Sequence, residues 1–68
     1  MEREQERKRI GQRIAELRRA NGMTQQEMAE RCGIFQSNIA RIEKGKYAVT
    51  VDILGRIADV LGMKVDFV

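Results

Sequence analysis

Four side chains that form hydrogen bonds stand close together near the middle of the chain: Gln36, Ser37, Asn38 and Arg41. In a helix over residues 36–43, Ile39 and Ile42 turn to the inside and leave these four polar residues for the outside. Amide, hydroxyl and guanidinium groups can donate to and accept from the edges of DNA bases in the major groove. A solvated polar face is the plain alternative, but Glu and Lys, which usually fill such a face, are scarce here. The composition therefore favours contact with bases.

A helix-turn-helix over residues 24–45 would place this polar face on the molecular surface. Thr24 and Glu27 have the spacing of a capping box, in which each side chain hydrogen-bonds to the backbone amide of the other residue. A Cys-Gly-Ile turn ends that helix, and Gly33 in the turn suits a left-handed helix end. The second helix of such a pair is the one that enters the major groove of DNA.

Two further helices are predicted around this unit. Ile10, Ile14 and Leu17 recur at spacings of four and three, which is typical of one face of a helix. Residues 1–8 are almost wholly polar and form an extension of that helix. Thr50 is a good N-cap for the last helix. The helices are predicted over residues 4–20, from residue 24 to the Cys-Gly-Ile turn, over 36–43 and over 50–61. The fold class is all-α, a compact four-helix arrangement in a single domain over residues 1–68.

The end of the chain changes its period. Met63, Val65 and Phe67 alternate with Lys64 and Asp66, which predicts a short C-terminal β-strand over residues 63–68. A disordered tail is the plain alternative. A lone strand, however, leaves its backbone groups unpaired and its apolar side chains in water. A two-fold-related copy would satisfy both needs, so we expect a homodimer through Met63, Val65 and Phe67.

Length and composition limit the other classes of function. The chain has 68 residues and a formal net charge of +3, which suits one small core and agrees with a partner that carries phosphates. It has no His and one Cys, Cys32, so we expect no catalytic, metal or cofactor site. The first ten residues, MEREQERKRI, lack the apolar core of a secretory leader, and no apolar run reaches membrane-spanning length. We therefore expect a cytoplasmic protein that is not an enzyme.

The chain from about residue 8 to residue 62 resembles the lambda-repressor-like, or Cro/XRE, family of helix-turn-helix DNA-binding domains. Each matching motif is weak alone, and their order and spacing together make the resemblance specific. The matching residues are Ile14, Leu17-Arg18, Thr24-Gln25, Met28-Ala29, Cys32-Gly33, Gln36-Ser37, Ile39 to Glu43, Gly45, Leu54, Ile57-Ala58 and Leu61-Gly62. The resemblance implies a compact helical domain whose third helix lies in the major groove.

The family also implies roles for single residues. The four polar residues of the third helix match its base-contacting positions. Gln25 matches a residue that contacts a phosphate and braces Gln36. Arg18 and Glu43 match a pair that forms a partly buried salt bridge, for which we expect a structural role. The alternative for this last pair is an exposed contact of little energetic value.

Three other residues border the expected DNA surface. The family usually has Ser, Thr or Gly at the position of Phe35, where it caps the recognition helix, and Phe cannot cap. We favour contact of Phe35 with the DNA backbone or a thymine methyl over a merely exposed apolar residue. Lys44 and Lys46 close the third helix, where phosphate contact and compensation of the helix dipole are about equally expected.

These observations predict a sequence-specific regulator, expected to be a repressor, that binds double-stranded DNA as a homodimer on a palindromic operator. A phage-type repressor or a restriction–modification controller would share the same helices. Several antitoxins carry this domain followed by a short C-terminal strand, so an antitoxin that also binds a toxin protein is one alternative. A helical protein-interaction module without DNA binding is another. Net acidic charge or a Glu-rich third helix would favour the last alternative, and the sequence has neither.

Overall fold

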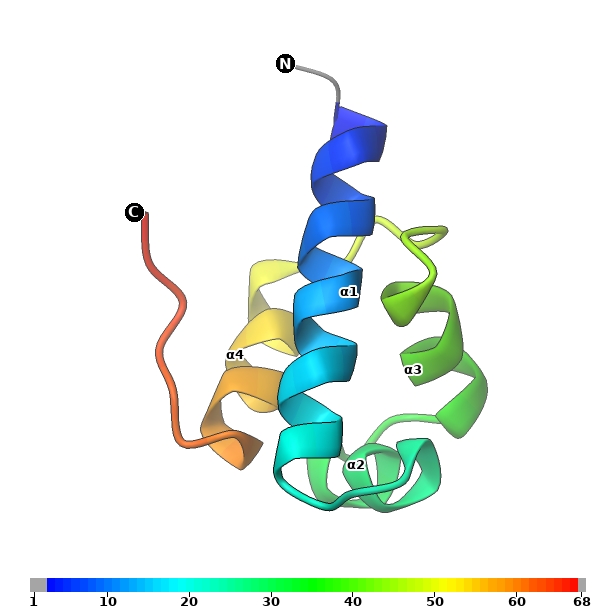
Figure 1. Cartoon of the computed structure of the whole chain (residues 1–68), viewed down its shortest axis with the longest axis vertical. Coiled ribbons are helices and arrows are strands. Elements are labelled where there is room, and N and C mark those ends of the chain that lie inside the picture. The colour runs from blue at the N-terminus through cyan, green and yellow to red at the C-terminus, as the bar shows by residue number, and fades with distance from the viewer. Residues whose placement is uncertain (1–2, 68) are drawn as a thin grey trace.

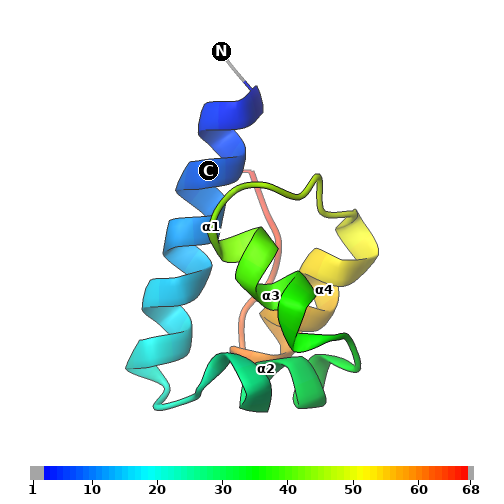
Figure 2. The ribbon, with the colours of Figure 1, turned by 90° about the vertical axis from the view of Figure 1, so that its right-hand side faces the viewer.

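Four helices follow one another in the computed structural model, which describes residues 3–67 (Figure 1). They are α1 (Arg3–Ala20), α2 (Gln25–Cys32), α3 (Gln36–Glu43) and α4 (Val51–Val60). The longest helix, α1, stands along one side, and α2 crosses the base beneath α3 (Figure 2). The four helices predicted from the sequence are confirmed, with ends that differ by a residue or so. None of the helices in the described range is both long and apolar enough to cross a membrane.

The starts of α2 and α4 are defined by threonine caps. Thr24 Oγ1 accepts a hydrogen bond from the Glu27 amide at 3.1 Å, and Glu27 Oε1 accepts one from the Thr24 amide at 2.9 Å. This confirms the predicted capping box. Thr50 Oγ1 accepts from the Ile53 amide at 3.2 Å at the start of α4. These bonds satisfy amides that have no partner inside a helix, so they fix where each helix begins.

A small apolar core fills the space between the helices. Its most deeply buried side chains are Met28 of α2, Ile39 of α3 and Ile57 of α4. Cys32 belongs to the same core, and burial raises the pKa of its thiol. It therefore packs as a small neutral residue. The core is completed by Ile14, Met23, Ala29 and Ile42.

Gly11 allows α1 to approach the end of α3 backbone to backbone. A Cβ atom added at Gly11 would lie 2.7 Å from the carbonyl oxygen of Glu43, closer than real Cβ contacts come, and would also overlap the carbonyl oxygen of Ile42. One turn earlier in α1, the backbone of Lys8 lies against Gly45 in the same way. The orientation of α3 therefore depends on the absence of a side chain at Gly11. No local pattern in the sequence around Gly11 predicts this contact.

The predicted C-terminal strand is wrong. Residues 63–67 leave α4 as an irregular segment, and the described range of 3–67 contains no β-strand; residue 68 lies outside it (Figure 1). A strand exists only when a neighbouring strand pairs with its backbone, and the four helices of one chain offer no such edge. The apolar side chains of this segment also stay in solvent. Val65 is 53% exposed, and Phe67 is fully exposed. Alternation of side chains alone therefore did not make a strand.

Candidate nucleic-acid interface

The outer face of α3 carries the side chains singled out by the sequence. Gln36, Ser37 and Arg41 are exposed, whereas Ile39 and Ile42 on the same helix are buried. Asn38 is half-buried. The eight residues of α3 thus separate into an apolar inner side and a hydrogen-bonding outer side, as their spacing predicts.

Phe35 occupies the N-cap position of α3 without capping it. Its backbone is extended, with φ −73° and ψ 144°, and its side chain makes no capping hydrogen bond. The ring is 79% exposed beside the start of the polar face. The first amides of α3 therefore receive no side-chain cap from Phe35.

A buried ion pair stands behind this face. Arg18 of α1 donates from Nε to Glu43 Oε2 at 2.7 Å and from Nη2 to Glu43 Oε1 at 3.1 Å. The two side chains are only 9% and 6% exposed. The hydrogen bond to Glu43 raises the pKa of Arg18, against the opposing effect of burial. The structure confirms the expected partly buried pair and excludes the alternative of an exposed contact.

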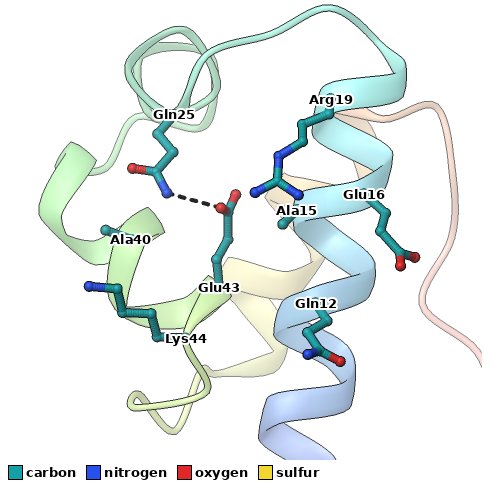
Figure 3. A pocket seen from close by; sticks show the side chains of 8 residues that line it. All are labelled: Gln12, Ala15, Glu16, Arg19, Gln25, Ala40, Glu43 and Lys44. Carbon is teal, nitrogen blue, oxygen red and sulfur yellow. Dashed lines mark hydrogen bonds between the residues drawn. The ribbon is translucent and has the colours of Figure 1, made fainter.

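Gln25 links that ion pair to the outer face. Its Nε2 donates to Glu43 Oε1 at 3.0 Å (Figure 3). Its Oε1 accepts from Gln36 Nε2 at 2.7 Å. A continuous chain of hydrogen bonds therefore runs from Arg18 through Glu43 and Gln25 to Gln36. It joins α1 to the outer face of α3. The expected brace between Gln25 and Gln36 is present.

The charge of Glu43 determines which way these amides point. A carboxylate only accepts hydrogen bonds, so the nitrogen of Gln25 must face Glu43 and the oxygen of Gln25 must face Gln36. Gln36 then uses one N–H group on Gln25. Its own oxygen and its second N–H group remain for a ligand. This acceptor and donor together are the pair that adenine requires at its N6 and N7 atoms.

Lys44 and Lys46 lie at the other end of α3. Lys44 stands on the wall of a groove of about 480 Å³ between α1 and α3, which Gln25 and Arg19 also line (Figure 3). Lys46 follows in the turn after the helix, where its amide donates to the carbonyl of Arg41 at 3.0 Å. Both lysines are exposed. Positive charge therefore borders the polar face at the position where the helix dipole is negative.

The structure adds one residue that the sequence analysis missed. The ring of Tyr47 lies beneath the guanidinium of Arg41, with 5.4 Å between Arg41 Cζ and the ring centroid. Tyr47 belongs to the irregular loop between α3 and α4, where neither helical nor strand periodicity marks a residue. The only sequence feature that points to Tyr47 is its place six positions after Arg41, and this feature is weak.

Comparison with known proteins agrees with this geometry. A helix-turn-helix family matches residues 14–68, which include the last part of α1 and the whole of α2, α3 and α4. The chain belongs to this helix-turn-helix family. The resemblance to Cro/XRE-type domains is thereby confirmed.

Individual relatives of this helix-turn-helix chain cover most of its length. A protein of Methanothermobacter thermautotrophicus named as an uncharacterised helix-turn-helix transcriptional regulator is 43% identical over 49 residues, which are 72% of this chain and 71% of that protein. The immunity repressor of Bacillus phage phi105 is 34% identical over 82% of this chain and 39% of its own length. The solved structure of the restriction–modification controller protein C.AhdI of Aeromonas hydrophila superposes with a TM-score of 0.85 at 29% identity, over 87% of this chain and 89% of that chain.

Proposed function

We propose that this protein is a transcriptional repressor that recognises a double-stranded DNA sequence with α3 in the major groove. The observation that carries the proposal is the set of hydrogen-bonding groups on the outer face of α3, in which Gln36 is fixed in direction from behind by Gln25 and Glu43. A preorganised amide loses less conformational entropy when it binds a base. The phage immunity repressor among the relatives supports repression as the outcome of binding.

In this proposal the roles of the site residues follow their positions. Gln36 contacts adenine, and Arg41 contacts guanine O6 and N7. Ser37 and Asn38 lie between them on the same face, and Asn38 contributes less because it is half-buried. The remaining residues meet the DNA backbone at the edges of the face, where amides and lysines bind phosphate oxygens and an exposed ring can pack on sugar. They are Gln25, Phe35, Lys44 and Lys46.

We further propose that the protein binds a palindromic operator as a homodimer. One chain presents one α3, so two copies are needed to occupy successive major grooves, about 34 Å apart. The support comes from the exposed apolar side chains of the C-terminal segment, Met63, Val65 and Phe67. This segment, α1 and α4 also line an open groove of about 550 Å³. Packing of side chains from a second copy, without strand pairing, would remove this surface from water.

The alternative partners have less support. The antitoxin hypothesis depends on a C-terminal strand, and the described segment is not a strand. No feature of residues 3–67 favours a toxin over a second copy of this chain. A protein-interaction module without DNA binding would not need the ordered amides behind α3.

Selection of bound sequences from a random pool of duplex DNA tests the proposal. We expect enrichment of a palindrome whose half-sites are centred about 10 base pairs apart. Arg41→Ala protein, selected in parallel, should lose the preference at one position of each half-site and keep the spacing. A pool that shows no enrichment with the unaltered chain would refute DNA recognition, and a single unrepeated half-site would refute the dimer.

A further inference from the structure

The contact between Arg41 and Tyr47 differs in kind from the contacts of three other arginines. Arg9, Arg13 and Arg18 each donate N–H groups to a carboxylate. Within residues 3–67, the guanidinium of Arg41 has no carboxylate partner and lies 5.4 Å from the Tyr47 ring centroid. Arg41 is therefore the one of these four whose cation is ordered by an aromatic ring.

An aromatic partner leaves the donors of an arginine free. A guanidinium that stacks on a ring uses its flat face, whereas hydrogen bonds to guanine O6 and N7 use the N–H groups along its edge. A carboxylate would occupy the same edge that the base needs. The ring of Tyr47 can therefore hold Arg41 in one orientation without competing for its hydrogen bonds.

The backbone after α3 brings the ring to this place. The amide of Gly45 donates to the carbonyl of Ile42 at 3.0 Å, and the amide of Lys46 donates to the carbonyl of Arg41 at 3.0 Å. Gly45 has a φ of +72°, which turns the chain back along the helix in a Schellman motif. Tyr47 follows directly. The loop thus brings the ring of Tyr47 back beside Arg41.

The ring of Tyr47 is itself anchored. Tyr47 is half-buried and packs against the apolar core, whereas Arg41 is exposed. A ring held by the core moves less than a surface arginine with several rotatable bonds. Since an arginine side chain loses much rotamer freedom when it binds, a fixed platform reduces that loss.

We propose that Tyr47 is a positioning residue that orients Arg41 for discrimination of one base pair. The inference depends on the proposed function, because it assigns to Tyr47 a part in the recognition of guanine by Arg41. Tyr47 itself touches no base in this arrangement. Its effect passes through the guanidinium.

A double-mutant cycle in the full-length chain tests the proposal. Affinity is measured for the selected duplex and for a duplex changed at the base pair assigned to Arg41. Tyr47→Leu keeps an apolar side chain and removes the ring, whereas Tyr47→Phe keeps the ring and removes the hydroxyl. We expect Tyr47→Leu to lower affinity for the selected duplex by about two- to five-fold, the range of an exposed cation–π contact, and Tyr47→Phe to leave it unchanged. In the Arg41→Ala background, Tyr47→Leu should have no further effect.

Three results would overturn the positioning role. An equal loss with Tyr47→Leu in both backgrounds would show a merely structural role. An equal loss with Tyr47→Phe and Tyr47→Leu would assign the effect to the hydroxyl. An unchanged affinity with Tyr47→Leu would show that the ring is dispensable.

A measurement without DNA separates this inference from the proposed function. The ring current of Tyr47 should shift the side-chain proton resonances of Arg41 in the free protein, and Tyr47→Leu should abolish the shift. If the shift is present but Arg41→Ala binds DNA as the unaltered chain does, the proposed role of Arg41 fails and the inference fails with it. If Arg41→Ala weakens binding and the shift is absent, only the inference fails.

Discussion

Nε of Arg18 in α1 lies 2.7 Å from Oε2 of Glu43 at the end of α3, and both side chains are almost fully buried. Glu43 Oε1 also accepts a hydrogen bond from Gln25, which in turn accepts one from Gln36 on the outer face of α3. One carboxylate therefore joins the stability of the domain to the direction of a side chain that we assign to base contact.

Glu43→Ala should lower the free energy of unfolding by about 3 kcal/mol, because it leaves the buried charge of Arg18 without its partner. Glu16→Ala is the matched control. Glu16 pairs with Arg13 at 3.4 Å, but both side chains are more than half exposed, at 61% and 62%, so its loss should change stability by less than about 1 kcal/mol. Chemical denaturation of both variants measures the difference. Equal effects would show that burial of the Arg18–Glu43 pair is not what stabilises the domain.

Gln25→Glu should weaken discrimination of adenine at the base pair assigned to Gln36. A carboxylate at this position cannot donate to Glu43, and repulsion between the two acids would displace the side chain that braces Gln36. Gln26→Glu introduces the same charge at the neighbouring exposed position and serves as the control. Binding titrations against matched and mismatched duplexes measure the ratio of affinities. If both variants lose the same affinity on every duplex, the added charge alone explains the result.

Gly11→Ala should destabilise the protein by about 1–3 kcal/mol, because the added methyl group would overlap the carbonyl oxygens at the end of α3. Gly55→Ala in α4 is the matched control, since a Cβ there meets no atom within 4 Å. Alanine has the higher helix propensity, so this control should stabilise by about 0.5–1 kcal/mol. Thermal unfolding of the two variants should therefore move in opposite directions. A tolerated Gly11→Ala would mean that α1 can retreat from α3 at little cost.

Phe67→Asp combined with Val65→Asp should convert a homodimer into a monomer, because charge replaces exposed apolar side chains that we assign to the interface. Sedimentation over a range of protein concentrations measures the association. Lys64→Asp adds charge to the same segment but removes no apolar side chain, and it should remain dimeric. If the double variant is still a dimer, α4 is the next candidate for the interface. If the unaltered chain is a monomer at high concentration, the homodimer proposal fails.

Local signals in the sequence were sufficient for the helices. The capping box of Thr24 and Glu27 and the spacing of Ile39 and Ile42 act within a few residues, so their effects do not depend on distant parts of the chain. The polar outer face of α3 follows from the same periodicity. The Arg18–Glu43 pair, by contrast, joins residues 25 positions apart and was foreseen only through family resemblance.

The sequence by itself determined where the helices lie and which side chains the third helix presents to the outside, because these properties arise from backbone bonds and side chains within one or two turns. Only the tertiary structure decided the close packing of Gly11 on α3, the position of the Tyr47 ring under Arg41 and the fate of the C-terminal segment. The first and the last depend on what a distant segment places next to the residue, and the second depends on the path of the loop after α3. The alternation of Met63, Val65 and Phe67 predicts a strand only where a neighbouring backbone is present to pair with it, and residues 3–67 of a single chain supply none.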